Sequence, residues 1–167
     1  MKLIKSLKPD LFVNRVSDIK ISKLLEWKIE GLILDVDNTL LPTKSKKLSN
    51  DIKLWVSEAS KKFKIIILSN NSEKKILRAA RQLNLSYIPW TLKPLNIYYK
   101  IALLKLGLSA EKVCAIGDQI FTDILGGKLS GMRAIYVKPI NEKEDSSWTK
   151  FVRIFERRLL KRWKIKI

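Results

Sequence analysis

The sequence predicts an α/β fold built on a doubly wound parallel sheet of about five strands. Three observations lead to this prediction: short apolar runs typical of buried strands, helical segments of about 10 to 15 residues between them, and polar residues directly after the runs. Strands and helices that alternate in this way form a parallel sheet with helices on both faces. The strands are expected at residues 31–34, 65–68, 87–88, 113–116 and 134–137.

The segments between these strands carry apolar residues at helical spacing. Before the first strand we expect a short helix within residues 17–27, packed on the edge of the domain. The later helices are expected between Ser49 and Phe63, after Ser72, from about residue 97 to Gly107, and over residues 122–129. Together the elements predict one domain, residues 1–167, with a core at about 28–140 and a C-terminal helix at about 147–165.

The composition excludes several classes of protein. A chain of 167 residues with 46% hydrophobic and 30% charged residues is typical of a globular domain. No apolar run is long enough to cross a membrane, and the residues after Met1 lack the features of a secretory signal. The absence of histidine excludes Ser-His and Cys-His catalysis and histidine metal sites. The single cysteine, Cys114, is expected to be a small core residue in a reducing compartment.

The chain is strongly basic, with 34 Lys and Arg against 16 Asp and Glu and a formal net charge of +18. A charge of this size attracts anionic partners, and both nucleic acid and anionic lipid fit it. A biased base composition of the gene would also produce many lysines without any role in binding. Biased base composition explains less well why basic residues cluster near the C-terminus.

Chemically active side chains follow the predicted strands. They are Asp35 and Asp37, Ser69 and Asn70, Lys93, and Asp118 and Asp123. Because parallel strands bring their carboxyl ends to one edge of the sheet, these groups can converge. Asp35 and Asp37 would point the same way and repel unless a proton or a cation lay between them. This arrangement favours a nucleophile, an acid/base group and a divalent metal in one site.

The motifs around these residues resemble those of the haloacid dehalogenase (HAD) superfamily of phosphotransferases. The four motifs are D-V-D-N-T-L at 35–40, I-L-S-N at 67–70, Lys93 with Pro94, and G-D-Q-I-F-T-D at 117–123. The longer patterns S-N-N, K-P, I-G-D-Q-x-F-T-D-x-L-G-G and T-K-x-x-R-x-x-E-R resemble the YqeG family of subclass IIIA phosphatases, which is related to phosphatidylglycerophosphate phosphatases. Thr91 and Lys128 depart from the usual alanine and asparagine, and we expect neither to touch the motif residues.

The resemblance implies a role for each motif residue in the hydrolysis of a phosphomonoester. Asp35 would attack phosphorus to form an aspartyl-phosphate, and Asp37 would protonate the leaving oxygen and then activate water. Mg²⁺ would be held by the Asp35 and Asp118 carboxylates and the Asp37 carbonyl. The remaining residues would bind the phosphate (Thr39, Ser69, Asn70 and Lys93) or orient Lys93 or a metal-bound water (Asp123). An acid at Asp37 also favours rapid hydrolysis of the intermediate, as in a phosphatase.

The predicted site is open to large substrates. Too few residues separate Asp37 from the second strand, or Ile88 from Lys93, to form a cap domain of about 50 residues. The C-terminal segment is a candidate for contact with an anionic membrane, because it predicts a basic amphipathic helix. Its predicted apolar face carries Trp148, Phe151, Val152, Phe155, Leu159 and Trp163. Its basic residues, Arg153 and Lys166 among them, are expected to face elsewhere.

We therefore expect a cytoplasmic, Mg²⁺-dependent phosphatase that acts at the inner surface of the membrane. Its expected substrate is a phospholipid phosphate, and the resemblance implies phosphatidylglycerophosphate. Two other functions stay open. One is a phosphatase of soluble sugar or nucleotide phosphates, of a type that often oligomerises so that a neighbour covers the site. The other is a basic RNA- or ribosome-associated module with vestigial activity. The C-terminal helix could equally pack its apolar face on the domain and leave its charges in water.

Overall fold

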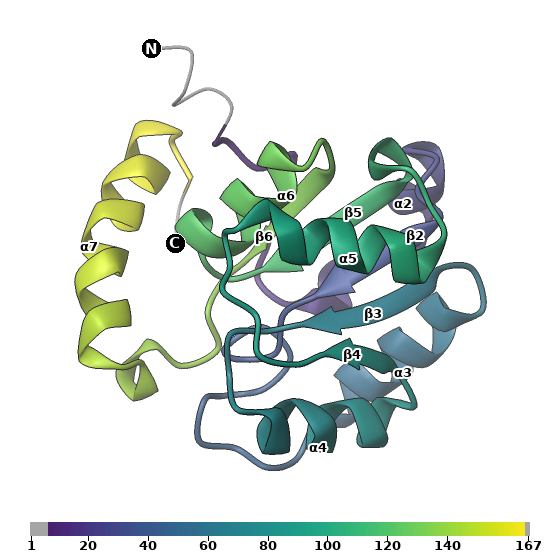
Figure 1. Ribbon diagram of the computed structural model, residues 1–167. Coiled ribbons are helices and arrows are strands. Elements are labelled where there is room, and N and C mark those ends of the chain that lie inside the picture. The colour runs from purple at the N-terminus through teal and green to yellow at the C-terminus, as the bar shows by residue number, and fades with distance from the viewer. Residues whose placement is uncertain (1–6, 166–167) are drawn as a thin grey trace.

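A computed structural model describes residues 7–165 and contains a six-stranded parallel sheet (Figure 1). The residues considered for a secretory signal and the basic residue Lys166 lie outside this range. The strand order is β1-β6-β5-β2-β3-β4, so the chain winds outward from β2 in both directions. The strands are β1 (Leu11–Val13), β2 (Gly31–Leu34), β3 (Lys64–Leu68), β4 (Ser86–Ile88), β5 (Val113–Gly117) and β6 (Arg133–Val137).

The predicted α/β sheet is confirmed, and it has one strand more than the expected five. The extra strand, β1, pairs with β6 at the edge of the sheet, with Leu11 opposite Ile135 and Val13 opposite Val137. It has only three residues, all half-buried, so its sequence lacks the apolar run that marks a central strand. The strand therefore forms because it pairs with β6, and its own sequence contributes little signal.

Helices cover both faces of the sheet (Figure 1). One face carries α2 (Ile21–Glu26), α3 (Asn50–Ser60) and α4 (Glu73–Leu83). The other carries α5 (Asn96–Leu106), α6 (Leu125–Leu129) and α7 (Ser147–Arg162). Short 3₁₀ turns occur at η1 (Val16–Asp18), η2 (Ala110–Lys112) and η4 (Glu142–Glu144), and η3 (Ile120–Ile124) is one π-helical turn. Within residues 7–165, none of the helices is long and apolar enough to cross a membrane.

The sheet separates two cores because successive side chains of a strand point to opposite faces. In β2, Leu32 and Leu34 pack beneath α3 and α4, whereas Ile33 packs against α5. All three are buried, as expected for a central strand of a parallel sheet. Cys114 is also fully buried in the first of these cores, as predicted for a small core residue.

The faces of α7 differ from the prediction. Arg153, Glu156 and Leu160 are buried against the domain, whereas the expected apolar face is split. Leu160 joins Ile120, Ile124 and Tyr136 in a third apolar cluster, with Leu159 and Trp163 packed beside it. The aromatic residues nearer the start of the helix point to solvent: Trp148, Phe151 and Phe155 are all exposed. The helix thus turns a partly charged face toward the sheet and leaves much of its aromatic surface open.

Candidate active site

The centre of the site lies at the carboxyl end of β2. Asp35 follows this strand directly and is almost completely buried. Lys93 Nζ donates hydrogen bonds to Asp35 Oδ1 at 2.6 Å and to Asp123 Oδ1 at 2.5 Å. The Thr39 hydroxyl lies 3.2 Å from Asp35 Oδ2 and 3.1 Å from Asp118 Oδ1. These contacts join three of the four predicted strand-end clusters, and the fourth is joined through the hydrogen bonds between Asn70 and Lys93, as expected for one edge of a parallel sheet.

Asp118 and Asp123 reach the centre from the end of β5 and from η3. A side chain at Gly117 would collide with the Asp123 carboxylate, so glycine allows the π-helical turn to fold back onto the strand end. Gln119 N–H donates to Asp123 Oδ2 and fixes the turn. Wide turns of this kind are frequent at functional sites because they re-aim side chains out of a regular helix.

Three buried carboxylates, those of Asp35, Asp118 and Asp123, place oxygen atoms within 4.8 Å of one another. Burial raises the pKa of Asp118 well above its ordinary value, against the opposing charge of Arg153, and Asp35 and Asp123 raise it further. Burial likewise raises the pKa of Asp123 to about 6, although Lys93 opposes the rise. Burial and the neighbouring carboxylates thus disfavour the ionised forms of Asp118 and Asp123, and the hard oxygen donors of the cluster fit Mg²⁺.

Lys93 remains a cation in this environment. Burial alone would lower the pKa of its ammonium group, but the carboxylates of Asp123 and Asp35 outweigh burial and raise it above the ordinary value. A buried ammonium group held between two carboxylates forms a fixed point charge beside Asp35.

Asp37 lies beside Asp35 but has different partners. Lys75 from the first turns of α4 forms an ion pair with Asp37 and also donates to the carbonyl of Thr43. Asn71 donates its amide to the other oxygen of Asp37. Burial lowers the pKa of Lys75. Lys75 is not predicted from the sequence, because a lysine in the first turn of a helix gives no signal of the direction in which it points.

The second and third motifs hold each other through side-chain to backbone hydrogen bonds. Lys93 N–H donates to Asn70 Oδ1 at 2.7 Å, and Asn70 Nδ2 donates to Lys93 O at 3.2 Å. Thr91 Oγ1 donates to Ser69 O at 2.7 Å and lies 3.0 Å from Asn70 Oδ1. The expectation that Thr91 avoids the motif residues is therefore wrong, because its hydroxyl ties the Lys93 loop to the end of β3. Lys128 pairs instead with Asp10, away from the motifs.

A second residue missed by sequence reasoning is Arg153 of α7. Its Nη2 pairs with Asp118 Oδ2, and its Nη1 donates to the backbone carbonyl of Asp118 at 3.1 Å. Its Nε pairs with Asp145, which accepts a further hydrogen bond from Asn38 at 2.6 Å. The expectation that Arg153 faces away from the domain is wrong. The helical pattern predicts that the charged residues of this segment face solvent, whereas Arg153 faces the domain because the Asp118 and Asp145 carboxylates bind it there.

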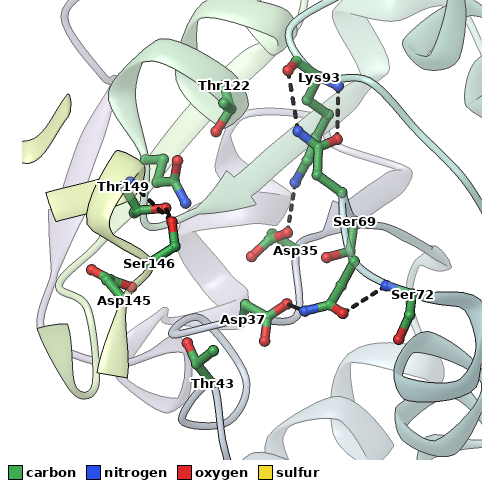
Figure 2. A pocket seen from close by; sticks show the side chains of 13 residues that line it. Asp35, Asp37, Thr43, Ser69, Ser72, Lys93, Thr122, Asp145, Ser146 and Thr149 are labelled. Carbon is green, nitrogen blue, oxygen red and sulfur yellow. Dashed lines mark hydrogen bonds and ion pairs between the residues drawn. The ribbon is translucent and has the colours of Figure 1, made fainter. Parts of the chain in front are cut away.

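An open cleft of about 350 Å³ lies above these groups. Figure 2 shows Asp35, Asp37 and Ser69 on one side, facing Ser146 and Thr149 at the start of α7 on the other. Of the predicted phosphate-binding residues, Ser69, Asn70 and Lys93 line this cleft. Thr39 does not, since its hydroxyl is held between two carboxylates below the floor. The arrangement presents the Asp35 and Asp37 carboxylates, the Lys93 ammonium group and the Ser69 hydroxyl to an incoming anionic ester.

Comparison with known proteins places this site in a family. Residues 1–86 match the model of the mitochondrial PGP phosphatase family, and residues 91–147 match that of the HAD-hydrolase-like family. Over 153 residues the chain is 33% identical to "Probable phosphatase YqeG" of Bacillus subtilis, covering 91% of this chain and 88% of the relative. The chain belongs to the YqeG family of HAD-type phosphatases. The predicted family and class of enzyme are thereby confirmed.

Solved structures share the fold of this YqeG-type phosphatase at low sequence identity. The cobalt-bound deoxy-D-mannose-octulosonate 8-phosphate phosphatase YrbI of Haemophilus influenzae is 14% identical, with a TM-score of 0.54 over 83% of this chain and 90% of the other. The magnesium-bound HAD hydrolase YfnB of Bacillus subtilis has the same identity and TM-score over 75% of this chain and 98% of its own. Both likenesses support the HAD-like fold.

Proposed function

We propose that this YqeG-type phosphatase is a Mg²⁺-dependent phosphomonoesterase that works through an aspartyl-phosphate on Asp35. The observation that carries the proposal is the position of the Asp35 carboxylate at the floor of the cleft, held through one oxygen by Lys93 and through the other by Thr39. An oriented, ionised carboxylate is the nucleophile required for in-line attack on phosphorus. Lys93 then offsets the charge that spreads over the transferring oxygens.

Asp37 is proposed to act as the acid/base group. Its carboxylate lines the same cleft and is oriented by Asn71 and Lys75. In the first half-reaction it would give a proton to the departing alkoxide oxygen, so that the alcohol leaves neutral. In the second it would take a proton from the water that attacks the phosphorus of the acyl phosphate, which releases inorganic phosphate and regenerates Asp35.

Asp35 and Asp118 are the proposed metal ligands, together with the backbone carbonyl of Asp37. When bound, Mg²⁺ would supply positive charge to phosphate oxygens and to the crowded carboxylates. Asp123 also belongs to the carboxylate cluster, but its Oδ1 accepts from Lys93 and its Oδ2 from Gln119 N–H. Its proposed role is therefore to orient Lys93.

The proposed substrate is a phospholipid phosphate, with phosphatidylglycerophosphate the first candidate. The match to the mitochondrial PGP phosphatase family over half of the chain supports this choice. The open cleft supports it as well, because a lipid headgroup must reach the site while its acyl chains remain in the bilayer.

Exposed apolar residues occur on two segments that also contribute residues to the cleft, and we call these exposed residues the apolar rim. One segment is the loop and helix start around Lys93, with Trp90, Leu92, Leu95 and Ile97 exposed. The other carries the ladder of Trp148, Phe151 and Phe155 on α7, whose successive ring centroids are 5.9 and 5.3 Å apart. Aromatic side chains at this density are typical of surfaces that enter the headgroup region of a bilayer.

Positive charge accompanies the apolar rim on α7. The exposed basic residues of this helix are Lys150, Arg157, Arg158, Lys161 and Arg162. Each contributes about 1 kcal/mol near an anionic bilayer at moderate salt. Attraction through these residues would hold the cleft against the inner surface of the membrane and should weaken as salt shortens the Debye length.

The proposal is tested with point substitutions rather than by removal of α7, because removal would also take Arg153 and Glu156 from the site. The test variant is Trp148→Ser/Phe151→Ser, and the matched control is Leu104→Ser, at an apolar position that is 81% exposed on α5. Each protein is assayed with Mg²⁺ on phosphatidylglycerophosphate in anionic vesicles and on soluble sugar and nucleotide phosphates. Binding to vesicles and to RNA is measured in parallel.

We expect the test variant to lose vesicle binding and activity on the vesicle-borne lipid while it retains any activity on soluble esters. The Leu104→Ser control should match wild type. If wild type hydrolysed a soluble ester faster than the lipid and did not bind vesicles, the proposed lipid substrate would be wrong and a soluble phosphate would be the substrate. Binding to RNA without turnover of any ester would contradict the proposed function as a whole.

A further inference from the structure

Arg153 makes the most extensive set of buried charged contacts among the described residues of α7. Its side chain is 2% exposed and has three carboxylate partners: Asp118, Asp145 and, with Nη1 and Oε2 3.6 Å apart, Glu156. Removing a guanidinium group from water costs several kcal/mol unless its hydrogen bonds are replaced. Here every nitrogen of the group has an oxygen partner. The cost of burying this charge is therefore offset by partners on three sides of the group.

The contacts of Arg153 converge on Asp118. Nη1 donates to the Asp118 carbonyl and Nη2 to its carboxylate oxygen Oδ2. The planar guanidinium group therefore binds both the backbone and the side chain of Asp118. A second link from α7, between Glu156 Oε1 and Phe121 N–H at 3.1 Å, holds the turn that follows. The helix therefore clamps the segment that begins with Asp118.

The two carboxylate oxygens of Asp118 have different surroundings. Arg153 occupies Oδ2, whereas Oδ1 lies 3.1 Å from the Thr39 hydroxyl, which also contacts Asp35 Oδ2. By taking one oxygen, the guanidinium group turns the other toward Asp35. Partners that orient a metal ligand in this way typically contribute about 10- to 100-fold to metal affinity.

We propose that Arg153 is a positioning residue that presents Asp118 Oδ1 to the cation, so that α7 forms part of the metal site. This inference rests on the proposed metal dependence. The role requires the planar fork of arginine, because a lysine ammonium group is a point charge and cannot hold the carbonyl and the carboxylate in one fixed geometry.

Arg153→Lys is the most informative variant, because it keeps the positive charge and removes the fork. Arg157→Lys is the matched control: Arg157 lies one turn further along α7, is half-exposed and pairs with Glu142. Mg²⁺ binding to each folded protein without substrate is measured by isothermal titration calorimetry, and melting curves in EDTA report the stability of the metal-free state.

We expect Arg153→Lys to bind Mg²⁺ about tenfold more weakly than wild type, with Arg157→Lys within about twofold. If Arg153→Lys does not melt cooperatively, Asp145→Asn takes its place, since it releases Arg153 Nε but leaves Arg153 and Asp118 intact. A smaller loss of affinity is then expected. Affinity equal to or tighter than wild type in the folded variant would overturn the role of Arg153. Failure of wild type to bind Mg²⁺ would instead overturn the metal site itself.

Discussion

Glu156 gives a quantitative test of how α7 is attached to the domain. Its side chain is buried on the inner face of the helix, where Oε1 accepts from Phe121 N–H. Burial raises the pKa of this carboxyl from its ordinary 4.5 to about 7, although the Phe121 hydrogen bond and Arg153 oppose the rise. The folded protein therefore holds this proton up to a higher pH than the unfolded chain does.

The sign of the effect follows from linkage. Between the unfolded pKa of 4.5 and the folded pKa of about 7, the native state binds more protons, so this group makes the free energy of unfolding fall as pH rises. Over pH 5 to 8 the expected loss is about 2 to 3 kcal/mol. For a chain of this length that corresponds to roughly 5 to 10 °C in melting temperature.

The perturbation is Glu156→Gln, which keeps an oxygen acceptor for Phe121 N–H and removes the titration. Urea unfolding is measured at pH 5, 6, 7 and 8 in EDTA, for wild type, for this variant and for Glu142→Gln as a control for the loss of one negative charge. Relative to the variant, wild type should lose about 2 to 3 kcal/mol from pH 5 to pH 8. Parallel pH profiles for wild type and Glu156→Gln would refute the reasoning.

Three further substitutions test the site. Asp118→Asn should weaken the Mg²⁺ dependence of activity more than phosphate binding, and an unchanged Mg²⁺ titration would argue against its role as a ligand. Lys93→Met should abolish turnover and, in EDTA, destabilise the fold by about 3 to 5 kcal/mol by breaking a buried ion pair, as measured by urea unfolding; turnover at the wild-type rate would count against Lys93. Lys75→Met should lower kcat by about tenfold, because Asp37 loses the partner that orients it. Lys62→Met is the exposed control, and an equal loss of kcat in this control would argue against a role for Lys75 in orienting Asp37.

The central part of the site could be predicted because two simple rules coincide there. Apolar runs define the central strands, and parallel strands bring their carboxyl ends to one edge. Asp35, Lys93 and Asp123 therefore converge without any knowledge of loop conformation, and the hydrogen bonds of Lys93 join them as expected. Their catalytic roles stay predictions.

The parts that could not be predicted depend on tertiary contacts. A helical pattern places charged residues outside, yet Arg153 and Glu156 lie inside because the Asp118 carboxylate and the Phe121 N–H provide partners there. Lys75 gave no signal for the same reason, since its partner Asp37 is distant in the sequence. The edge strand β1 was missed because three half-buried residues carry too little hydrophobic pattern.

The central claim is that Asp35 is the nucleophile of a phosphatase. Its most direct test is Mg²⁺-dependent phosphate release from phosphatidylglycerophosphate in anionic vesicles by wild type, Asp35→Asn and the surface control Asp51→Asn. An amide has nearly the shape of the carboxylate but cannot attack phosphorus, so we predict that Asp35→Asn melts as a folded protein and retains less than about one hundredth of wild-type activity. Activity above about that level in folded Asp35→Asn would contradict the account.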